Sequence, residues 1–238
     1  MIPKVINYCW FGKKSLPNSV KKNIKTWRKI CPDYKIVEWN ENNFNVTDNK
    51  FVEEAYKNHA WAFVSDYARL KIIYEYGGIY LDTDVEIIRK LDSLLNNKAY
   101  IGIQRREKLC ASGLGFGAEK HNPVIKKMLL KYENLHFDPK KKMELSCPNL
   151  NNAVIRERGY KSSDTITQLN DITVYPPKYF DPLSPGFTND LLMPETYTIH
   201  HYNASWLCGK EKLKRQMVNL IGQENANFLK KHLSLKNL

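Results

Sequence analysis

The chain has 238 residues, a length typical of one domain or of one domain with a small appendage. Its composition is 42% hydrophobic and 12% aromatic with 11 Gly and 11 Pro, which excludes a fibrous, low-complexity or mainly disordered chain. The start does not read as a secretory signal, and no window approaches a membrane-spanning apolar run, so we expect a cytoplasmic protein. Five cysteines without a C-x-x-C pair argue against a disulfide framework or a cysteine zinc site.

The formal charge of +12 is concentrated in two segments. Residues 11–30 contain seven Lys and Arg and no acid, and residues 209–238 contain seven Lys and Arg and two Glu, so the rest of the chain is near neutral. A basic chain can bind nucleic acid, but no helix-turn-helix, zinc-finger or RNA-binding pattern is present. Two explanations remain open, namely solvated helix faces or attraction to an anionic membrane surface or polyanionic acceptor.

The C-terminal segment 209–238 has apolar residues at helical spacing among its lysines, as in Leu213, Met217 and Leu220. This pattern predicts a basic amphipathic helical tail. Such a tail either packs on the domain as a closing helix or docks at the inner face of the cell membrane, and the pattern does not decide between the two.

Strand and helix patterns alternate along the chain, and the early order of strand, helix and strand favours an α/β sheet of the nucleotide-binding type. We expect the longest helical region to end at the pair Gly77-Gly78, because glycine is a good helix C-cap. The predicted strands are 2–10, 34–39, 79–88, 100–104, 114–118, 172–175 and 197–201, and the predicted helical regions are 20–31, 51–76, 121–133 and 151–158.

The segment 79–88 contains an acidic pattern. In an extended strand, Tyr80, Asp82, Asp84 and Glu86 point to the same face. Facing carboxylates repel each other unless a positive charge lies between them, and Mg²⁺ or Mn²⁺ would serve. The pair alone is a weak signal, since the exposed polar face of an edge strand looks the same.

The helix before it carries Asp66 and Arg69, three residues apart and therefore on one face. They can present both signs of charge to a ligand. Alternatively, Arg69 forms a structural ion pair with Asp66 or Glu75.

Three separated blocks, residues 2–12, 65–86 and 199–206, together resemble the DXD glycosyltransferases of the capsular-polysaccharide and initiation-mannosyltransferase type, which are distantly similar to the clostridial glucosylating toxins. The resemblance implies a Rossmann-like GT-A fold over residues 1–208, followed by the tail 209–238. The sequence departs from the family pattern at Asn7, where histidine is common in the family. Residues 104–170 match the family only loosely.

The resemblance also implies roles for residues of the three blocks. Asp82, Asp84 and Arg69 would be catalytic, and the metal, Mn²⁺ or Mg²⁺, would be held by Asp82, Asp84 and His200, with His201 in reserve. Trp10 would stack on the base of the nucleotide. The donor-binding residues it implies are Trp10, Asp66, Arg69, Tyr80, Asp82, Thr83, Ser205 and Trp206.

The expected function is retaining transfer of a hexose from a nucleotide sugar, a UDP-sugar in preference to a GDP-sugar, to a glycan or lipid-linked acceptor in surface polysaccharide synthesis. One alternative is a haloacid-dehalogenase-type phosphatase, which also has an Asp-x-Asp after an apolar strand. It is disfavoured because those enzymes open with that strand, and because Glu86 replaces the expected Thr or Val. The other alternative is a basic nucleic-acid-binding protein.

Overall fold

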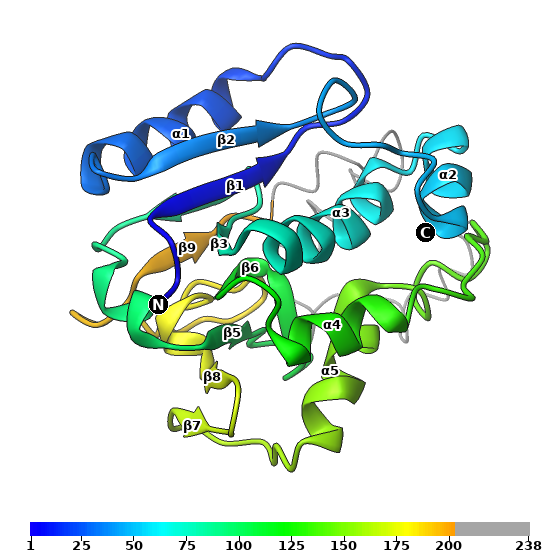
Figure 1. The fold of residues 1–238 in the computed structure, drawn as a ribbon. Helices are drawn as coiled ribbons and strands as arrows, with labels where there is room; N and C mark the ends of the chain where they lie inside the picture. The colour runs from blue at the N-terminus through cyan, green and yellow to red at the C-terminus, as the bar shows by residue number, and fades with distance from the viewer. Residues whose placement is uncertain (203–238) are drawn as a thin grey trace, which may run out of the picture.

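A seven-stranded mixed sheet, in the order β2-β1-β3-β6-β5-β8-β7, runs through the protein (Figure 1). The computed structural model describes residues 1–202. Strands β2, β1 and β3 are parallel, whereas β6 runs antiparallel to both β3 and β5. The strands of this sheet are β1 (Val5–Cys9), β2 (Lys35–Trp39), β3 (Gly78–Tyr80), β5 (Ala99–Ile103), β6 (Cys110–Ala118), β7 (Thr167–Gln168) and β8 (Thr173–Tyr175).

A separate two-stranded ladder pairs β4 (Val85–Ile87) with β9 (Thr198–His200), which lie more than a hundred residues apart in sequence. Two short 3₁₀ turns, η1 (Asp92–Asn96) and η2 (Pro177–Tyr179), lie in the connections between strands.

The helices are α1 (Asn18–Ile30), α2 (Lys50–Lys57), α3 (Trp61–Tyr76), α4 (Pro123–Leu130) and α5 (Cys147–Glu157). Within the described residues, no helix is long and apolar enough to cross a membrane.

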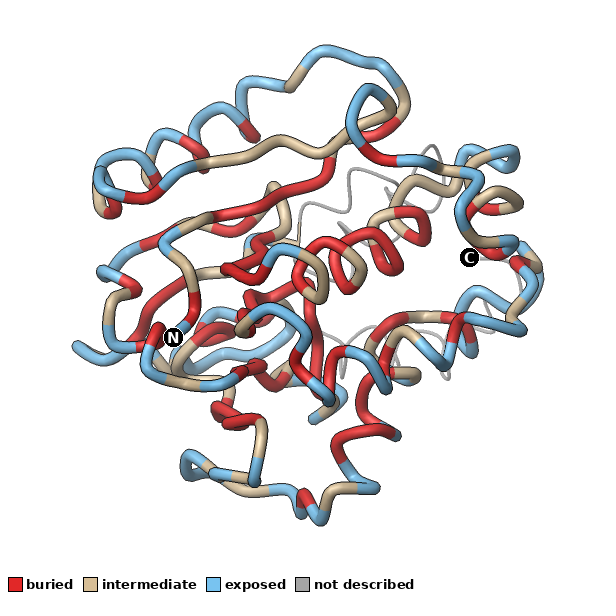
Figure 2. Tube along the Cα trace, in the orientation of Figure 1, coloured by how far each residue is buried: buried red, intermediate tan, exposed pale blue. Residues whose placement is uncertain are grey.

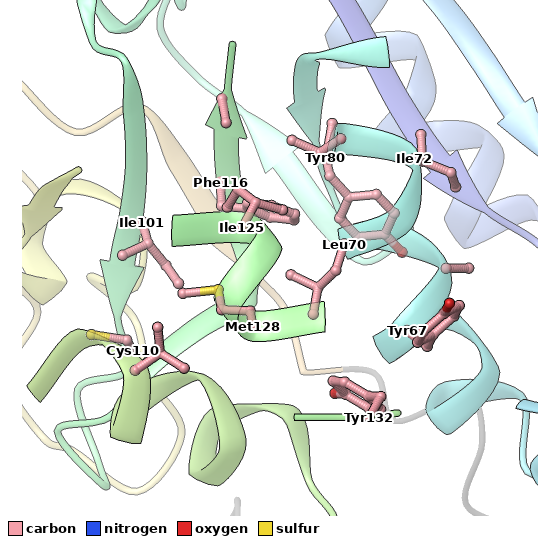
Figure 3. Packing of buried hydrophobic residues seen from close by; sticks show 14 of the residues in the cluster. Tyr67, Leu70, Ile72, Tyr80, Ile101, Cys110, Phe116, Ile125, Met128 and Tyr132 are labelled. Carbon is pink, nitrogen blue, oxygen red and sulfur yellow. The ribbon is translucent and has the colours of Figure 1, made fainter. Parts of the chain in front are cut away.

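The main sheet has a hydrophobic cluster on each face. Helices α3, α4 and α5 cover one face, and α3, which contacts β1, β3 and β6, is buried along most of its length (Figure 2). Figure 3 shows Leu70 of α3 together with Tyr80, Phe116 and Met128 in this cluster. Helix α1, η1 and the β4–β9 ladder supply the cluster on the other face. The acidic segment after β3 therefore leaves the sheet between two packed layers.

Most predicted elements are present, and the glycine pair ends α3 as expected. Gly77 and Gly78 have φ of 71° and 105°, a left-handed region that favours glycine. A Cβ on Gly78 would lie 2.8 Å from the carbonyl oxygen of Val5, so the pair also lets β3 approach β1. The predicted helical region 51–76 is two helices, because His59 between them has φ of 54° and cannot continue a helix.

The predicted strand 79–88 is wrong as a continuous element. Strand β3 ends at Tyr80 and β4 begins at Val85, with a turn between them in which the Val85 N–H donates to the Asp82 carbonyl. The paired carboxylates therefore lie on a turn and not on one face of a strand. The predicted strand 114–118 begins earlier, at Cys110, while β7 and η1 had no corresponding prediction. The boundary at residue 208 and the tail 209–238 lie outside the described residues.

Candidate functional site

The candidate site lies where two parallel strands end side by side. In β1 and β3, Asn7 is paired with Tyr80, so the residues that follow each strand emerge at the same edge of the sheet. Trp10 follows β1, and the turn from Asp82 to Asp84 follows β3. In α/β sheets, ligands bind at the carboxyl ends of parallel strands.

Helix α1 fixes the acidic turn through three hydrogen bonds. The Asn23 amide donates to the Thr83 carbonyl at 2.9 Å, and the Trp27 indole N–H donates to the Val85 carbonyl at 2.8 Å. The Thr26 hydroxyl accepts the N–H of Ile87 at 3.1 Å. These bonds satisfy part of the backbone of the turn and of β4, so α1 helps to hold the two carboxylates in place.

Asp82, Asp84 and His200 form a cluster at this turn. One ligand atom from each lies within 4.8 Å of the other two, and His200 Nε2 is 3.2 Å from an Asp84 oxygen. The β4–β9 ladder brings the histidine there by pairing Val85 with His200. Two carboxylates and an imidazole, all partly buried, are a donor set that fits Mn²⁺ and less closely Mg²⁺.

The electrostatics of the cluster favour a bound positive charge. Burial raises the pKa of Asp82, and Asp84 raises it further, although the neighbouring Arg69 acts in the opposite direction. Burial lowers the pKa of His200, but the charges of Asp84 and Asp82 outweigh it, so the pKa lies above its ordinary value. The cluster therefore stabilises bound positive charge, whether a proton or a cation.

His201, the reserve ligand, lies outside this cluster. Its Nε2 is 2.9 Å from Glu86, and its backbone N–H donates to the Asp84 carbonyl. The structure thus brings His200 to the carboxylates and directs His201 to the next acid along β4.

Arg69 lies beneath the cluster, with only 4% of its side chain exposed. Its Nη2 is 3.1 Å from both Asp66 and Asp82, and its guanidinium lies 4.9 Å from the ring centre of Tyr80. Of the two structural pairings considered for Arg69, the one with Asp66 is present. The one with Glu75 is wrong, because Glu75 pairs with Lys71.

The remaining residues predicted to bind the donor differ in how deeply they are buried. Tyr80 is 1% exposed, and its hydroxyl reaches the site only by donating to Asp82 at 3.1 Å. Thr83 contributes its carbonyl to the bond from Asn23 described above. Ser205 and Trp206 lie outside the described residues.

Trp10 borders an open hollow of about 420 Å³. Its indole N–H donates to the Lys14 carbonyl at 2.6 Å, which fixes the ring at the rim. The lining of this hollow does not include Asp66, Arg69 or Tyr80, so the tryptophan and the charged residues form neighbouring features of one sheet edge. The hollow is lined by Trp10, Lys13, Lys14, Glu38, Asn40, Glu41 and Asn42.

Gly113 of β6 is a site residue that the sequence did not reveal. A Cβ there would lie 2.4 Å from Asp82 Oδ2 and 3.1 Å from Arg69 Nη1, so only glycine leaves room for this ion pair. The signal available was the glycine-rich stretch after Ser112, which reads equally well as turns.

The start of α5 was missed as well. Burial raises the pKa of Asp66, whereas Arg69 and hydrogen bonds from Cys147 at the helix start lower it. The Ser112 hydroxyl lies 3.5 Å from the Cys147 sulfur, and the Asn151 amide donates to Ser112 at 3.1 Å. These contacts join α3, β6 and α5 under the site, and they depend on a part of the chain where the resemblance is loose.

Part of the sequence matches a known protein family. Residues 17–101 match the glycosyltransferase sugar-binding region containing a DXD motif, and the matched span includes both Asp66–Arg69 and Asp82–Asp84. This region is similar to the DXD glycosyltransferases. Outside this DXD region, the chain supplies His200 of the cluster and the helices α4 and α5.

Relatives of the DXD region include inositol phosphoceramide mannosyltransferase 3 of Schizosaccharomyces pombe, 30% identical over 128 residues that cover 52% of this chain and 35% of that protein. Another is the uncharacterized glycosyltransferase L373 of Acanthamoeba polyphaga mimivirus, 27% identical over 87% of this chain and 84% of that protein. The matches span only 35% and 40% of two fission-yeast mannosyltransferases.

Solved structures confirm the fold. The PaToxG glycosyltransferase superposes with a TM-score of 0.55 at 22% identity, covering 66% of this chain and 69% of that one. A glycosyltransferase involved in glycosylation of the major capsid of PBCV-1 gives a TM-score of 0.50 at 11% identity, covering 92% of this chain and all of that one. The expected GT-A fold is therefore correct.

Proposed function

We propose that this protein is a metal-dependent, retaining glycosyltransferase that moves a hexose from a nucleotide sugar to a glycan or lipid-linked acceptor. The observation that carries the proposal is the cluster of Asp82, Asp84 and His200, which lies at the carboxyl end of β3 and joins the family's DXD motif to a distant histidine. The match to the DXD family model and the fold both favour sugar transfer over the phosphatase and nucleic-acid alternatives.

Asp82, Asp84 and His200 would hold the cation, which when bound supplies positive charge against the diphosphate that leaves the sugar. Mn²⁺ suits an imidazole with two carboxylates better than Mg²⁺ does. Arg69 fixes Asp82 from below and pairs Asp66, so both carboxylates are held in place before the donor arrives. Such preorganisation lowers the reorganisation needed as charge develops.

Trp10 and its hollow are the proposed place for the base of the nucleotide. A partly exposed indole at the rim offers a face on which a base can stack, and Lys13 and Lys14 beside it attract a phosphorylated ligand. Asp66 would accept a sugar hydroxyl, and Ser205 and Trp206 would complete the leaving-group side. We expect a uridine donor in preference to a guanosine donor, and front-face attack by the acceptor hydroxyl.

A lipid-linked acceptor and contact with an anionic membrane are part of the same proposal. Two relatives are named inositol phosphoceramide mannosyltransferases, which supports an acceptor that carries a lipid. Helix α1 exposes a row of basic residues that would face an anionic membrane surface. We propose that the protein acts on the cytoplasmic side of this membrane, in the synthesis of a surface polysaccharide. The exposed basic residues of α1 are Lys21, Lys22, Lys25, Arg28 and Lys29.

A screen of UDP- and GDP-hexoses tests the proposal. With Mn²⁺ present, the protein should hydrolyse at least one of them slowly without an acceptor, and a chelator should abolish this. The same donor and metal together should raise the thermal unfolding temperature, because a ligand that binds only the native state stabilises it. Hydrolysis of p-nitrophenyl phosphate without any nucleotide-sugar turnover would support the phosphatase alternative and contradict the proposal.

A further inference from the structure

A buried carboxylate lies behind the histidine of the cluster. Asp181 follows η2 and is 0% exposed. Its Oδ2 accepts the backbone N–H of Arg105 at 2.8 Å and the hydroxyl of Tyr202 at 2.7 Å. Ser184, also buried, is close enough to lower the pKa of this carboxyl, yet Oδ1 has no hydrogen bond of normal geometry within residues 1–202. A buried acceptor without a donor is costly.

A complementary atom lies on His200. Its Nε2 faces Asp84, whereas its Nδ1 is buried and has no hydrogen-bond partner among the described residues. The charge of Asp181 raises the pKa of His200 and that of His200 lowers the pKa of Asp181, which agrees with their proximity. One buried donor position and one buried acceptor position are thus left over in the same part of the protein.

Tyr202 connects the two residues. Its ring lies 4.1 Å from the His200 ring in an edge-to-face arrangement, while its hydroxyl holds Asp181. The backbone of Tyr202 has φ of 50°, a left-handed conformation that is uncommon for a bulky residue. Strain of this kind persists where the surrounding contacts impose it, and it occurs often at functional sites.

The chemistry of metal-binding histidines explains the arrangement. An imidazole that binds a cation through Nε2 must carry its proton on Nδ1, and that proton is normally donated to a carboxylate, a carbonyl or a water. His200 and Asp181 form no hydrogen bond or ion pair with each other within residues 1–202, so one water between Nδ1 and Oδ1 would satisfy both orphan atoms. Thr198, two residues earlier on β9, also has a buried hydroxyl without a partner in the described part of the chain, so a bridging water would find a third contact.

We propose that Asp181 is a positioning residue that accepts the Nδ1–H of His200 through one bridging water, so that Nε2 presents its lone pair to the cation held with Asp82 and Asp84. This inference rests on the proposed function. It adds a carboxylate from the second half of the chain that touches neither donor nor acceptor and acts through the histidine.

Asp181→Asn tests it, because the amide oxygen can keep the bonds from Arg105 and Tyr202 while the amide NH₂ replaces Oδ1. The amide then donates to the bridging water, which can in turn donate to Nδ1 and so favours the tautomer with its proton on Nε2. We expect Mn²⁺ affinity, measured by the electron paramagnetic resonance signal of free Mn²⁺, to fall about 10- to 100-fold. The matched control is Asp171→Asn, a partly buried carboxylate paired with Lys98 and Arg158, which should bind Mn²⁺ as the wild type does.

A double-mutant cycle separates positioning from a merely structural role. In a His200→Ala background, Asp181→Asn should cause no further loss of Mn²⁺ affinity, because the residue through which Asp181 acts is gone. Tyr202→Phe, which removes one bond to Asp181, should weaken binding several-fold only when His200 is present, and it serves if Asp181→Asn fails to fold. Unchanged affinity in both variants, or an equal loss without His200, would overturn the inference alone. A wild type that binds no Mn²⁺ would overturn the proposed function with it.

Discussion

Two groups of charges share Asp82, and they differ in how their charge is balanced. In the inner group, Arg69 lies 3.1 Å from both Asp66 and Asp82 with 4% of its side chain exposed. In the outer group, Asp82 and Asp84 face each other with His200 as their partner, and the side chains of the two carboxylates are 27% and 19% exposed. The inner group is closed to solvent and contains a permanent cation, whereas the outer group is partly exposed and balances two carboxylates only with a titratable histidine. The inner group therefore has a structural role, and the outer group can bind a cation.

The largest expected effect comes from removing the cation of the inner group. Arg69→Met should destabilise the protein by about 3–5 kcal/mol, because Asp66 is left as an uncompensated buried charge. Urea unfolding of metal-free protein measures this.

The matched control for that change lies two residues further along α3. Lys71→Met breaks two pairs at the surface, with Glu75 and with Asp48, whose side chains are a third to a half exposed, and should cost no more than about 1 kcal/mol. Equal stability losses in the two variants would contradict the distinction between buried structural ion pairs and pairs at the surface.

A smaller effect should follow from filling the space between the groups. In Gly113→Ala the new Cβ, placed 2.4 Å from Asp82 Oδ2, must push that carboxylate away from its present position. We expect a loss of about 1–3 kcal/mol in stability, as for other overpacked sites, together with weaker Mn²⁺ binding. Wild-type Mn²⁺ affinity in this variant would show that the position of Asp82 does not matter to the outer group.

The smallest expected effect concerns the chemical reactivity of two buried thiols, Cys147 and Cys9, near Arg69 of the inner group. Cys147 lies 3.9 Å from Arg69, and burial raises the pKa of its thiol; burial also raises the pKa of Cys9 to about 12, with Arg69 lowering it in part. At pH 8 roughly one Cys9 thiol in ten thousand is then ionised, and only the thiolate reacts. Iodoacetamide at pH 8 followed by mass spectrometry should find both cysteines unmodified in native protein and alkylated after unfolding. Stoichiometric native labelling would mean that the inner group is open to solvent.

The same comparison shows which parts of the site the sequence could predict. The pairing of Asp66 with Arg69 follows from helical spacing, and the proximity of Asp82 to Asp84 follows from their separation by one residue. The expected strand across 79–88 was wrong because its alternation of apolar and polar residues fits both a strand and a strand–turn–strand. Hydrogen bonds from Asn23 and Trp27 of α1 decide between them, and local periodicity does not report such contacts.

Contacts distant in sequence limited the rest of the prediction. The nearness of His200 to the carboxylates was expected only through a family resemblance, because it depends on the ladder between β4 and β9. Asp181 had no recognisable signal, and the glycine-rich stretch around Gly113 was ambiguous, since the importance of both residues comes from the atoms packed against them. The alternating order of elements was enough for the fold class, while the full site required the second half of the chain to be placed.

The central claim is that the outer group binds a cation through Asp84, and one Mn²⁺ titration tests it most directly. Wild type, Asp84→Asn and Glu86→Gln are titrated side by side, with free Mn²⁺ followed by its electron paramagnetic resonance signal. Glu86 is the matched control because it lies on the same segment but pairs with His201. We predict at least a 100-fold loss of affinity for Asp84→Asn, about 2.7 kcal/mol, with Glu86→Gln close to wild type. Equal affinity in all three proteins, or a loss confined to Glu86→Gln, would contradict the account.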